Sequence, residues 1–212
     1  MPIVFVISAP SGTGKSTLAN RVVEGDSRIE FAISVTTRPP RVQESDGKDY
    51  HFVSEERFLQ MRDNGEFLEW AEVFGSYYGT PVSAVDDAQQ RGRDVLLDID
   101  VQGASLLKDR LPHAVRIFIL PPSSGMLESR LRKRASDDEA AIRRRLDEAA
   151  REIGEHTSYD YVVVNDEVAA AVESLRAILS AERSKRQQMK PTVDSILSDF
   201  GIPSDANSEV CE

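Results

Sequence analysis

The sequence is poor in the residues that build disulfide-bonded proteins, cysteine metal cages and membrane anchors. Its only cysteine, Cys211, lies next to the end of the 212-residue chain, which excludes an internal disulfide and a cysteine-based metal cage. The longest apolar run near the start, Ile3 to Ile7, is too short to cross a bilayer or to form the apolar part of a secretion signal. We therefore expect a cytoplasmic protein with no membrane partner.

Basic residues are also in the minority. Lysine and arginine number 26 against 36 aspartates and glutamates, a net charge of -10, whereas nucleic-acid-binding proteins usually present a basic face. No nucleic-acid partner is expected, and any anion site must be local. The three histidines, His51, His113 and His156, form no motif. With 40% hydrophobic and 29% charged residues, the composition suits one globular domain with room for inserted lobes.

Apolar segments alternate with helical patterns along the chain. Strands are predicted at "IVFVIS", "FAISV", "DVLLDID", "AVRIFIL" and "YDYVVVN", with a further pair at "EFLEWAEVF" and "SYYGT". Helices are predicted between them, including one with Thr80 as N-cap and Pro81 at its first position. This alternation predicts an α/β protein with a parallel sheet covered by helices on both faces. The polar end of the chain, residues 189–212, is expected to be a flexible tail.

The stretch "ISAPSGTGKSTL", residues 7–18, has the form of a phosphate-binding loop. A Gly-rich turn between a strand and a helix exposes backbone N–H groups to a phosphate, and the helix adds the positive end of its dipole. Lys15 would reach the terminal phosphates of ATP, and Ser16 would place a hydroxyl on Mg²⁺. Ala9 stands where the usual pattern has its first glycine, which matters only if the position requires a positive φ. The predicted ATP-binding residues of the loop are Ser11, Gly12, Thr13, Gly14, Lys15, Ser16 and Thr17.

Two carboxylates end the strand "VLLDID". Nucleotide-binding sheets deliver an acid beside the metal in this way, so Asp98 and Asp100 are candidates. An aspartate at a strand end is often only a turn or helix cap, and the pattern gains weight because a phosphate loop accompanies it. Neither feature identifies the phosphate acceptor, because ATPases, GTPases and small-molecule kinases share the loop.

The polar segment "SVTTRPPRVQESDGKDYHF" and the strand pair after it hold candidates for acceptor binding. Arg38 and Arg41 lie three residues apart with Tyr50 nearby, and two guanidinium groups and a phenol suit a phosphate. A solvated basic loop is the alternative interpretation. In "FLEWAEVFGSYYGT", Glu69 interrupts an apolar strand. A carboxylate can accept two hydrogen bonds side by side, which guanine offers through N1–H and its 2-amino group and adenine does not.

Seven blocks of this sequence occur in the order and spacing found in guanylate kinases. They are "SAPSGTGKST", "SVTTRPPR", "GKDYHFV", "GEFLEWAEVFGSYYGT", "LLDIDVQG", "RLRKR" and "VVVND". The chain therefore resembles the guanylate kinases over roughly Ile3 to Arg183. The resemblance implies the reaction ATP + GMP → ADP + GDP, with dGMP as a second acceptor and Mg²⁺ as the cofactor.

The resemblance also implies the architecture. The expected fold is the three-layer P-loop NTPase fold with a parallel central sheet, an inserted GMP-binding lobe and a helical lid. The core would comprise residues 1–32, 83–122 and 154–188, the GMP-binding lobe residues 33–82 and the lid residues 123–153. The partners would be ATP and GMP, with no obligate protein partner.

Roles carry over from the resemblance residue by residue. Ser34, Glu69, Thr80 and Asp100 would read the guanine, and Arg38, Arg41, Tyr50 and Tyr78 would hold the GMP phosphate. Asp98 would lie beside GMP and contact the metal through water, with Ser16 as the other metal contact. The catalytic set would be Lys15, Arg38 and the lid arginines Arg130, Arg134 and Arg145, and Asn165 would contact the adenine side of ATP.

Two alternatives stay open from the sequence. A catalytically inactive guanylate-kinase-like module would bind a protein through the same lobe, but such modules lack an intact phosphate loop, and "GTGKS" is intact here. A kinase for another nucleoside monophosphate is disfavoured by Glu69 and Asp100.

Overall fold

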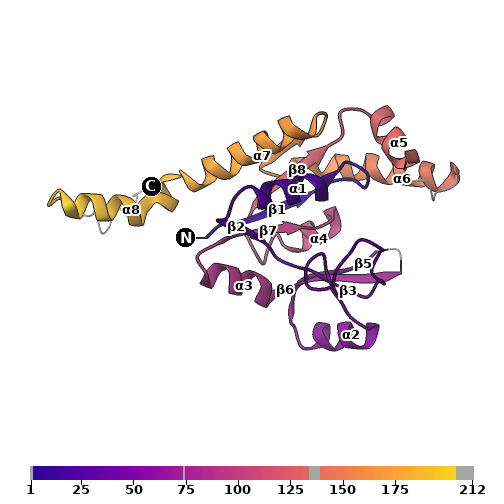
Figure 1. Ribbon diagram of the computed structural model, residues 1–212, viewed down its shortest axis with the longest axis horizontal. Coiled ribbons are helices and arrows are strands. Elements are labelled where there is room, and N and C mark those ends of the chain that lie inside the picture. Colours follow the sequence, from indigo (N-terminus) through magenta and orange to yellow (C-terminus); the bar gives the residue numbers. More distant parts are fainter. Residues whose placement is uncertain (1, 74, 134–138, 204–212) are drawn as a thin grey trace. The chain divides into compact units, whose positions relative to one another are not determined.

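The computed structural model describes residues 2–73, 75–133 and 139–203. The chain divides into two compact units, residues 1–174 and 175–212, and each is described by itself. The first unit contains a five-stranded sheet, a four-stranded sheet and a pair of helices, and it carries the candidate site (Figure 1).

The five-stranded sheet is parallel throughout. Its order is β2 (Ile29–Phe31), β7 (Asp94–Asp98), β1 (Val4–Ser8), β8 (Val115–Leu120) and β9 (Tyr161–Val164). β1 lies at the centre, and Ile7 pairs in register with Asp98 of β7. Because the carboxyl ends of parallel strands meet at one edge, this register brings the loop after β1 next to the carboxylates after β7.

Both faces of this sheet are covered by helices, as predicted. Val4 and Val6 pack in one cluster with residues of α3 (Val82–Gln90) and α4 (Val101–Leu106). Successive strand residues point to opposite faces, so Phe5 and Ile7, which are fully buried, point to the other face. Figure 1 shows α1 (Lys15–Glu24) on that side of the sheet and α3 and α4 on the opposite side.

The smaller sheet is mixed. Its order is β4 (His51–Phe52), β3 (Val35–Thr36), β6 (Ser76–Pro81) and β5 (Phe67–Val73), with β3 and β6 antiparallel and β5 and β6 antiparallel. Helix α2 (Glu55–Asp63) packs on this sheet through Phe58, whose buried ring stacks 4.5 Å from that of Phe67. Ser54 is the N-cap of α2 and accepts a hydrogen bond from the backbone N–H of Arg57, as a Ser start predicts.

Helices α5 (Ser124–Lys133) and α6 (Glu139–Gly154) form a hairpin over the end of the five-stranded sheet (Figure 1). Leu127 and Leu131 of α5 pack against Leu146 and Ala149 of α6. The 3₁₀ turn Glu155–Ser158 then leads into β9. Residues 134–138, which join the two helices and include Arg134, lie outside the described residues.

Two local predictions in the first unit are wrong. "FAISV" is not one strand: β2 ends at Phe31 in the large sheet, and β3 begins at Val35 in the small one, so the chain crosses between sheets where one strand was expected. Thr80 is not a helix N-cap. It continues β6 and its hydroxyl donates to Glu69, and α3 begins one residue later than expected, with Pro81 as its N-cap residue.

The second unit holds most of α7 (Val168–Arg183) and all of α8 (Arg186–Asp199). α8 corrects the expected tail, because residues 189–199 are helical. Apolar residues recur at helical spacing in Met189, Val193 and Ile196, and Lys190 forms an ion pair with Asp194 one turn on at 2.9 Å. Residues 204–212, with Cys211, lie outside the described residues.

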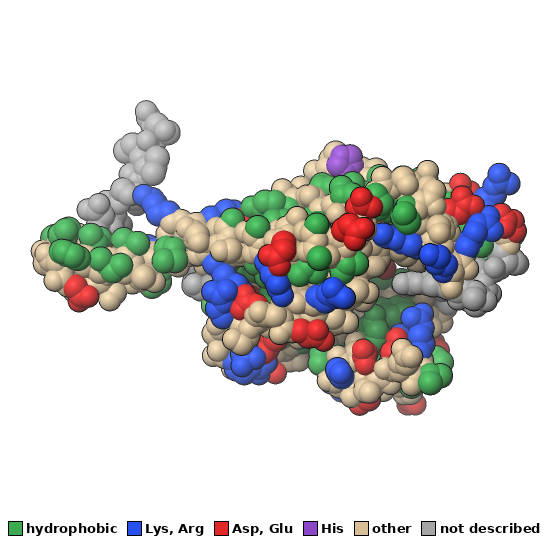
Figure 2. Space-filling model, turned by 45° about the horizontal axis from the view of Figure 1, so that its top comes forward, with side chains coloured by type: hydrophobic (Ala, Val, Ile, Leu, Met, Phe, Trp, Pro, Cys, Tyr) green, Lys and Arg blue, Asp and Glu red, His purple; other side chains and the backbone are tan. Residues whose placement is uncertain are grey.

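The distribution of charged side chains on the surface is in line with the net negative charge of the sequence. On the face shown in Figure 2, acidic and basic side chains are interspersed and do not gather into one basic field. Among the described residues, no helix combines the length and apolar character that crossing a membrane requires.

Candidate functional site

A cleft of about 820 Å³ lies between the phosphate loop, the smaller sheet with its connecting loops, and helix α6. Most of the predicted site residues meet there. Those lining the cleft are Ser11, Gly12, Thr13, Gly14, Lys15, Ser16, Thr17, Ser34, Arg38, Arg41, Tyr50, Tyr78, Asp98, Asp100 and Arg145. Glu69, Thr80, Arg130 and Asn165 are not in this lining, and Arg134 lies outside the described residues.

The phosphate loop adopts a conformation that depends on two glycines. Gly12 and Gly14 have φ values of 92° and 91°, in the region that residues with a Cβ rarely adopt. A Cβ on Gly14 would also lie 2.7 Å from the Asn165 side-chain nitrogen. Gly14 caps α1, so the N-terminus of that helix opens toward the cleft, as anion binding requires.

Lys15 is held at the junction of β7 and the loop. Its Nζ forms an ion pair with Asp98 Oδ1 at 2.7 Å and donates to the Ile99 carbonyl oxygen at 2.5 Å. An ammonium group carries three N–H donors, so these two contacts leave one for a phosphate oxygen. The sequence predicted both residues as site residues, and the structure pairs them.

Asn165 and Arg130 contact the phosphate loop but are not part of the cleft lining. The Asn165 side-chain nitrogen donates to the Thr13 carbonyl at 2.6 Å, and the side chain is only 2% exposed. Arg130 donates to the same carbonyl at 3.2 Å and to the Asn165 carbonyl at 3.0 Å. Both residues therefore brace the loop in this structure, and their predicted contacts with ATP stay predictions.

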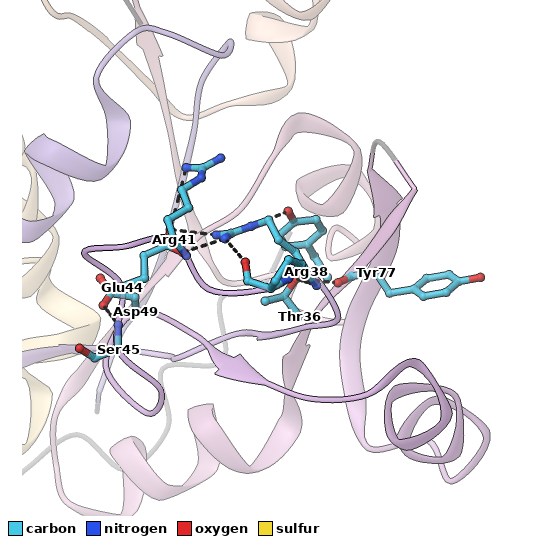
Figure 3. A network of polar contacts seen from close by, with 9 residues as sticks. Thr36, Arg38, Arg41, Glu44, Ser45, Asp49 and Tyr77 are labelled. Carbon is cyan, nitrogen blue, oxygen red and sulfur yellow. Dashed lines mark hydrogen bonds and ion pairs between the residues drawn. The ribbon is translucent and has the colours of Figure 1, made fainter. Parts of the chain in front are cut away.

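Arg38 is the centre of the polar network on the smaller sheet (Figure 3). Its Nε donates to the Tyr78 hydroxyl at 3.2 Å, and its two Nη atoms donate to the carboxylate of Glu44 at 2.7 and 2.9 Å. Its Cζ lies 5.4 Å from the centroid of the Tyr50 ring. The bond to Glu44 raises the pKa of Arg38, so this residue carries a permanent positive charge into the cleft.

The tyrosine and the carboxylate in this network have shifted pKa values. Burial, and next the charge of Asp98, raise the pKa of Tyr50 to about 12, so its phenol remains a hydrogen-bond donor at neutral pH. The hydrogen bonds from Arg38 lower the pKa of Glu44, which keeps Glu44 ionised. The network thus offers phenol and guanidinium donors to an anion.

A second cluster of polar side chains comes from β5, β6 and the residue before β3. The Thr80 hydroxyl donates to Glu69 Oε1 at 2.6 Å and lies 3.4 Å from the Ser34 hydroxyl. Glu69 is 7% exposed, and this burial raises its pKa to about 7. Asp100 caps α4 by accepting from the backbone N–H of Gly103 at 2.7 Å, and its charge adds to the upward shift of the Glu69 pKa.

The close approach of Glu69 to α4 requires a glycine. A Cβ on Gly103 would lie 2.9 Å from Glu69 Oε2 and 3.2 Å from Asp100 Oδ1. Both distances are below ordinary contact, so Gly103 allows the two predicted guanine-reading carboxylates to stand side by side.

Helix α6 contributes charges of both signs to the cleft. Arg145, Glu148 and Glu152 line it along one face of the helix. Burial, and then the charges of Glu148 and Asp100, raise the pKa of Glu152 to about 7. Arg145 was predicted from the sequence as a site residue, and the two glutamates were not.

The structure adds four residues that sequence analysis missed. They are Glu44, Gly103, Glu148 and Glu152. The three-residue and four-residue spacings of Arg145, Glu148 and Glu152 could have placed them on one helix face. Glu44 and Gly103 gave no local sign, because their importance comes from neighbours on other segments.

Comparison with known proteins adds an independent finding. The guanylate kinase family model matches residues 2–182. The guanylate kinase of Nitratidesulfovibrio vulgaris is 49% identical over 195 residues, which cover 92% of this chain and 94% of that one. That of Koribacter versatilis is 53% identical over 186 residues, which cover 86% and 80%.

A solved structure agrees with these sequence matches. The crystal structure of guanylate kinase from Anaplasma phagocytophilum aligns with a TM-score of 0.75 and 39% identity, and the alignment covers 95% of this chain and 96% of that one. An alignment of this extent shows that the two chains share one fold. The chain belongs to the guanylate kinase family.

Proposed function

We propose that this protein transfers the γ-phosphoryl group of ATP to GMP, and also to dGMP, and so serves the recycling of guanine nucleotides. One observation carries the proposal: a single cleft joins a phosphate loop to an arginine and tyrosine cluster, and Asp100 in its lining stands next to a buried glutamate. The loop suits the donor nucleotide, the cluster suits the acceptor phosphate, and the glutamate suits guanine.

The ATP side of the cleft binds and positions the donor phosphates. The backbone N–H groups of the loop and the start of α1 face the anion, and Lys15 offers its remaining N–H to a terminal phosphate oxygen. An oxygen of the GMP phosphate attacks the γ-phosphorus, the bond between that phosphorus and the β–γ bridging oxygen breaks, and ADP leaves. Positive charges around the transferred group stabilise the transition state, so no covalent enzyme intermediate is needed.

The donor set also fits Mg²⁺. Ser16 and Asp98 both line the cleft, and hydroxyl and carboxylate oxygens are among the ligands this ion takes. Mg²⁺ usually binds through one or two protein oxygens together with phosphates and water, which accords with the finding of no group of three or more metal-binding side chains among the described residues. When bound, the ion would neutralise phosphate charge.

The acceptor side selects guanine through hydrogen bonding. Ionised Glu69 can accept from guanine N1–H and from the 2-amino group, and the Ser34 and Thr80 hydroxyls stand next to it. Adenine offers an acceptor at its N1 position and would leave the buried carboxylate unpaired, which is costly. Arg38, Arg41 and the two tyrosines would hold the phosphate.

Three parts of the chain would act together in this scheme. Residues 33–82, which contain the smaller sheet and α2, would bind GMP, residues 123–153 would form a lid, and the remainder of the first unit would bind ATP. Closure of both parts over the nucleotides would exclude water, which otherwise competes with GMP for the phosphoryl group. An inactive binding module is disfavoured because the phosphate loop is complete and its lysine is in place.

A coupled assay of ADP release tests this function. The protein is supplied with Mg²⁺-ATP and, in turn, with GMP, dGMP, AMP, CMP and UMP. The kcat/KM for GMP is expected to exceed that for AMP by on the order of 10⁴, the discrimination that unpaired buried hydrogen-bonding groups can give. Comparable turnover of AMP or UMP would contradict the assignment of guanine.

A substitution in the phosphate loop provides a second test of the proposed function. Lys15→Ala is expected to reduce kcat by on the order of 10³ or more, because a transition-state contact is lost, while GMP binding measured by calorimetry stays close to that of the wild type. An unchanged kcat would show that this loop does not serve catalysis.

A further inference from the structure

Glu44 stands among the positive charges of the cleft, although it is itself an anion. We propose that Glu44 is a positioning residue for acceptor binding: it fixes Arg38 and the Arg41 backbone so that both arginines meet the phosphate of the nucleoside monophosphate. This inference rests on the proposed function, because it concerns the residues assigned to that phosphate.

The contacts of Glu44 hold both arginines (Figure 3). Its Oε2 accepts from Arg38 Nη1 at 2.7 Å and from the Arg41 backbone N–H at 2.8 Å, while its Oε1 accepts from Arg38 Nη2 at 2.9 Å. The Glu44 and Arg38 side chains are only 16% and 15% exposed. Such a two-point pair sets the plane of a guanidinium, which a single contact does not.

The donors of Arg38 are nearly all in use. A guanidinium has five N–H groups. Within the described residues, Nε donates to Tyr78, Nη1 donates to Glu44 and to the Pro39 carbonyl, and Nη2 donates to Glu44. These contacts leave one N–H, on Nη2, so Arg38 offers the phosphate a single, fixed donor.

Arg41 complements this fixed donor. Its side chain is 75% exposed and its Nη1 lies 3.9 Å from Glu44 Oε1, whereas its backbone is held by Glu44. The guanidinium can therefore turn toward a ligand from an anchored Cα. Glu44 thus links one rigid and one adaptable arginine, and it does so without touching the phosphate itself.

Because Glu44 is charged, the direction in which the KM for GMP changes on its replacement tests the inference. A carboxylate beside a phosphate dianion repels it, so removal of the charge alone would lower the KM for GMP. If positioning dominates, removal of the carboxylate raises that KM, because Arg38 loses its two-point contact. Misplacement of a binding group by about 1 Å can cost on the order of 10²-fold, and we expect a rise of about 10-fold to 100-fold.

The experiment compares Glu44→Gln with Asp49→Asn. Both remove one negative charge from the same loop, and both residues line the cleft. Asp49 accepts from the Ser45 backbone N–H, which asparagine can still do, and among the described residues no hydrogen bond or ion pair joins Asp49 to either arginine. Steady-state kinetics with GMP and ATP are measured for both, together with inhibition by guanosine, which carries the base and lacks the phosphate. Thermal unfolding confirms that the variants are folded.

Four results support the inference together: a raised KM for GMP in Glu44→Gln, an unchanged KM for ATP, unchanged inhibition by guanosine, and no rise in the KM for GMP in Asp49→Asn. An unchanged or lowered KM for GMP in Glu44→Gln would overturn it, as would an equal loss of guanosine inhibition, which would indicate a general disturbance of the lobe. Arg38→Lys, which keeps the charge but loses the two-point contact, is expected to repeat the Glu44→Gln result. If the wild type does not turn over GMP, the proposed function fails separately.

Discussion

Replacing Glu69 with glutamine separates the energetic cost of a buried carboxylate from its use in binding. The side chain is 7% exposed, and burial raises its pKa from 4.5 to about 7. The folded protein therefore binds this proton more tightly than the unfolded chain does. The corresponding stability is fully present below about pH 4.5 and is lost as the pH rises through about 7.

The size of the effect follows from the shift. Each pKa unit corresponds to about 1.4 kcal/mol. Relative to pH values below about 4.5, titration of Glu69 therefore lowers the free energy of unfolding by about 1 kcal/mol near pH 5, where only the unfolded chain is largely ionised at this group, and by about 3 kcal/mol near pH 8. Glutamine avoids this cost because it does not ionise, and its carbonyl can still accept from the Thr80 hydroxyl. Glu69→Gln should thus be more stable than the wild type, increasingly so at higher pH.

The same substitution should damage acceptor binding. A glutamine amide offers guanine one acceptor and one mismatched donor where the carboxylate offered two acceptors. The KM for GMP is expected to rise by on the order of 10²-fold or more near pH 8, with the KM for ATP unchanged. A variant that is more stable and less active is the expected signature of a functional buried charge.

Urea unfolding of the nucleotide-free wild type and variant near pH 5 and pH 8 measures the difference in their free energies of unfolding. Glu72→Gln is the matched control, because Glu72 is an exposed glutamate on the same strand, and its effect should stay within about 0.5 kcal/mol at both pH values. A stability difference for Glu69→Gln that does not grow with pH would refute the pKa argument. An unchanged KM for GMP would refute the role in reading guanine.

Three further predictions concern the same cleft and its supporting lobe. Gly103→Ala, whose Cβ would lie 2.9 Å from Glu69 Oε2, should raise the KM for GMP at least about 5-fold by displacing that carboxylate, whereas Gly125→Ala, with nothing within 4 Å, should leave kinetics unchanged. Phe58→Ala should lower the free energy of unfolding by about 3–5 kcal/mol in urea titrations, because a fully buried ring is removed. In the wild type, the KM for GMP should fall as the pH rises through about 7, since Glu69 binds guanine when ionised, and a flat pH profile would contradict this.

The phosphate loop illustrates what local sequence can predict. The strand, Gly-rich turn and helix of residues 4–24 form where the pattern placed them, because hydrophobic runs, positive-φ glycines and helix starts depend mostly on near neighbours. The fold class and the family followed from the alternation of strands and helices and from the collinear blocks. Ala9, which departs from the usual pattern, is accommodated as a buried residue.

Local sequence patterns gave wrong predictions where a distant segment supplies the partner of a residue. Thr80 has the character of an N-cap, yet its hydroxyl serves Glu69 from a neighbouring strand. Residues 31–35 look like one strand, yet two different sheets take their two ends. The expected tail contains α8, whose helical spacing of apolar residues was weak beside its polar composition.

The sequence alone determined that the protein has a phosphate loop, a parallel α/β core and the residue types suited to a phosphate and to guanine. Tertiary structure decided how the donors and charges of those residues are used: Lys15 is paired with Asp98, Arg38 has most of its N–H groups committed to Glu44, Tyr78 and a backbone carbonyl, and Glu69 is buried next to Asp100. The physical reason is that hydrogen-bond partners and burial depend on strand register and packing between distant segments, which no local pattern encodes.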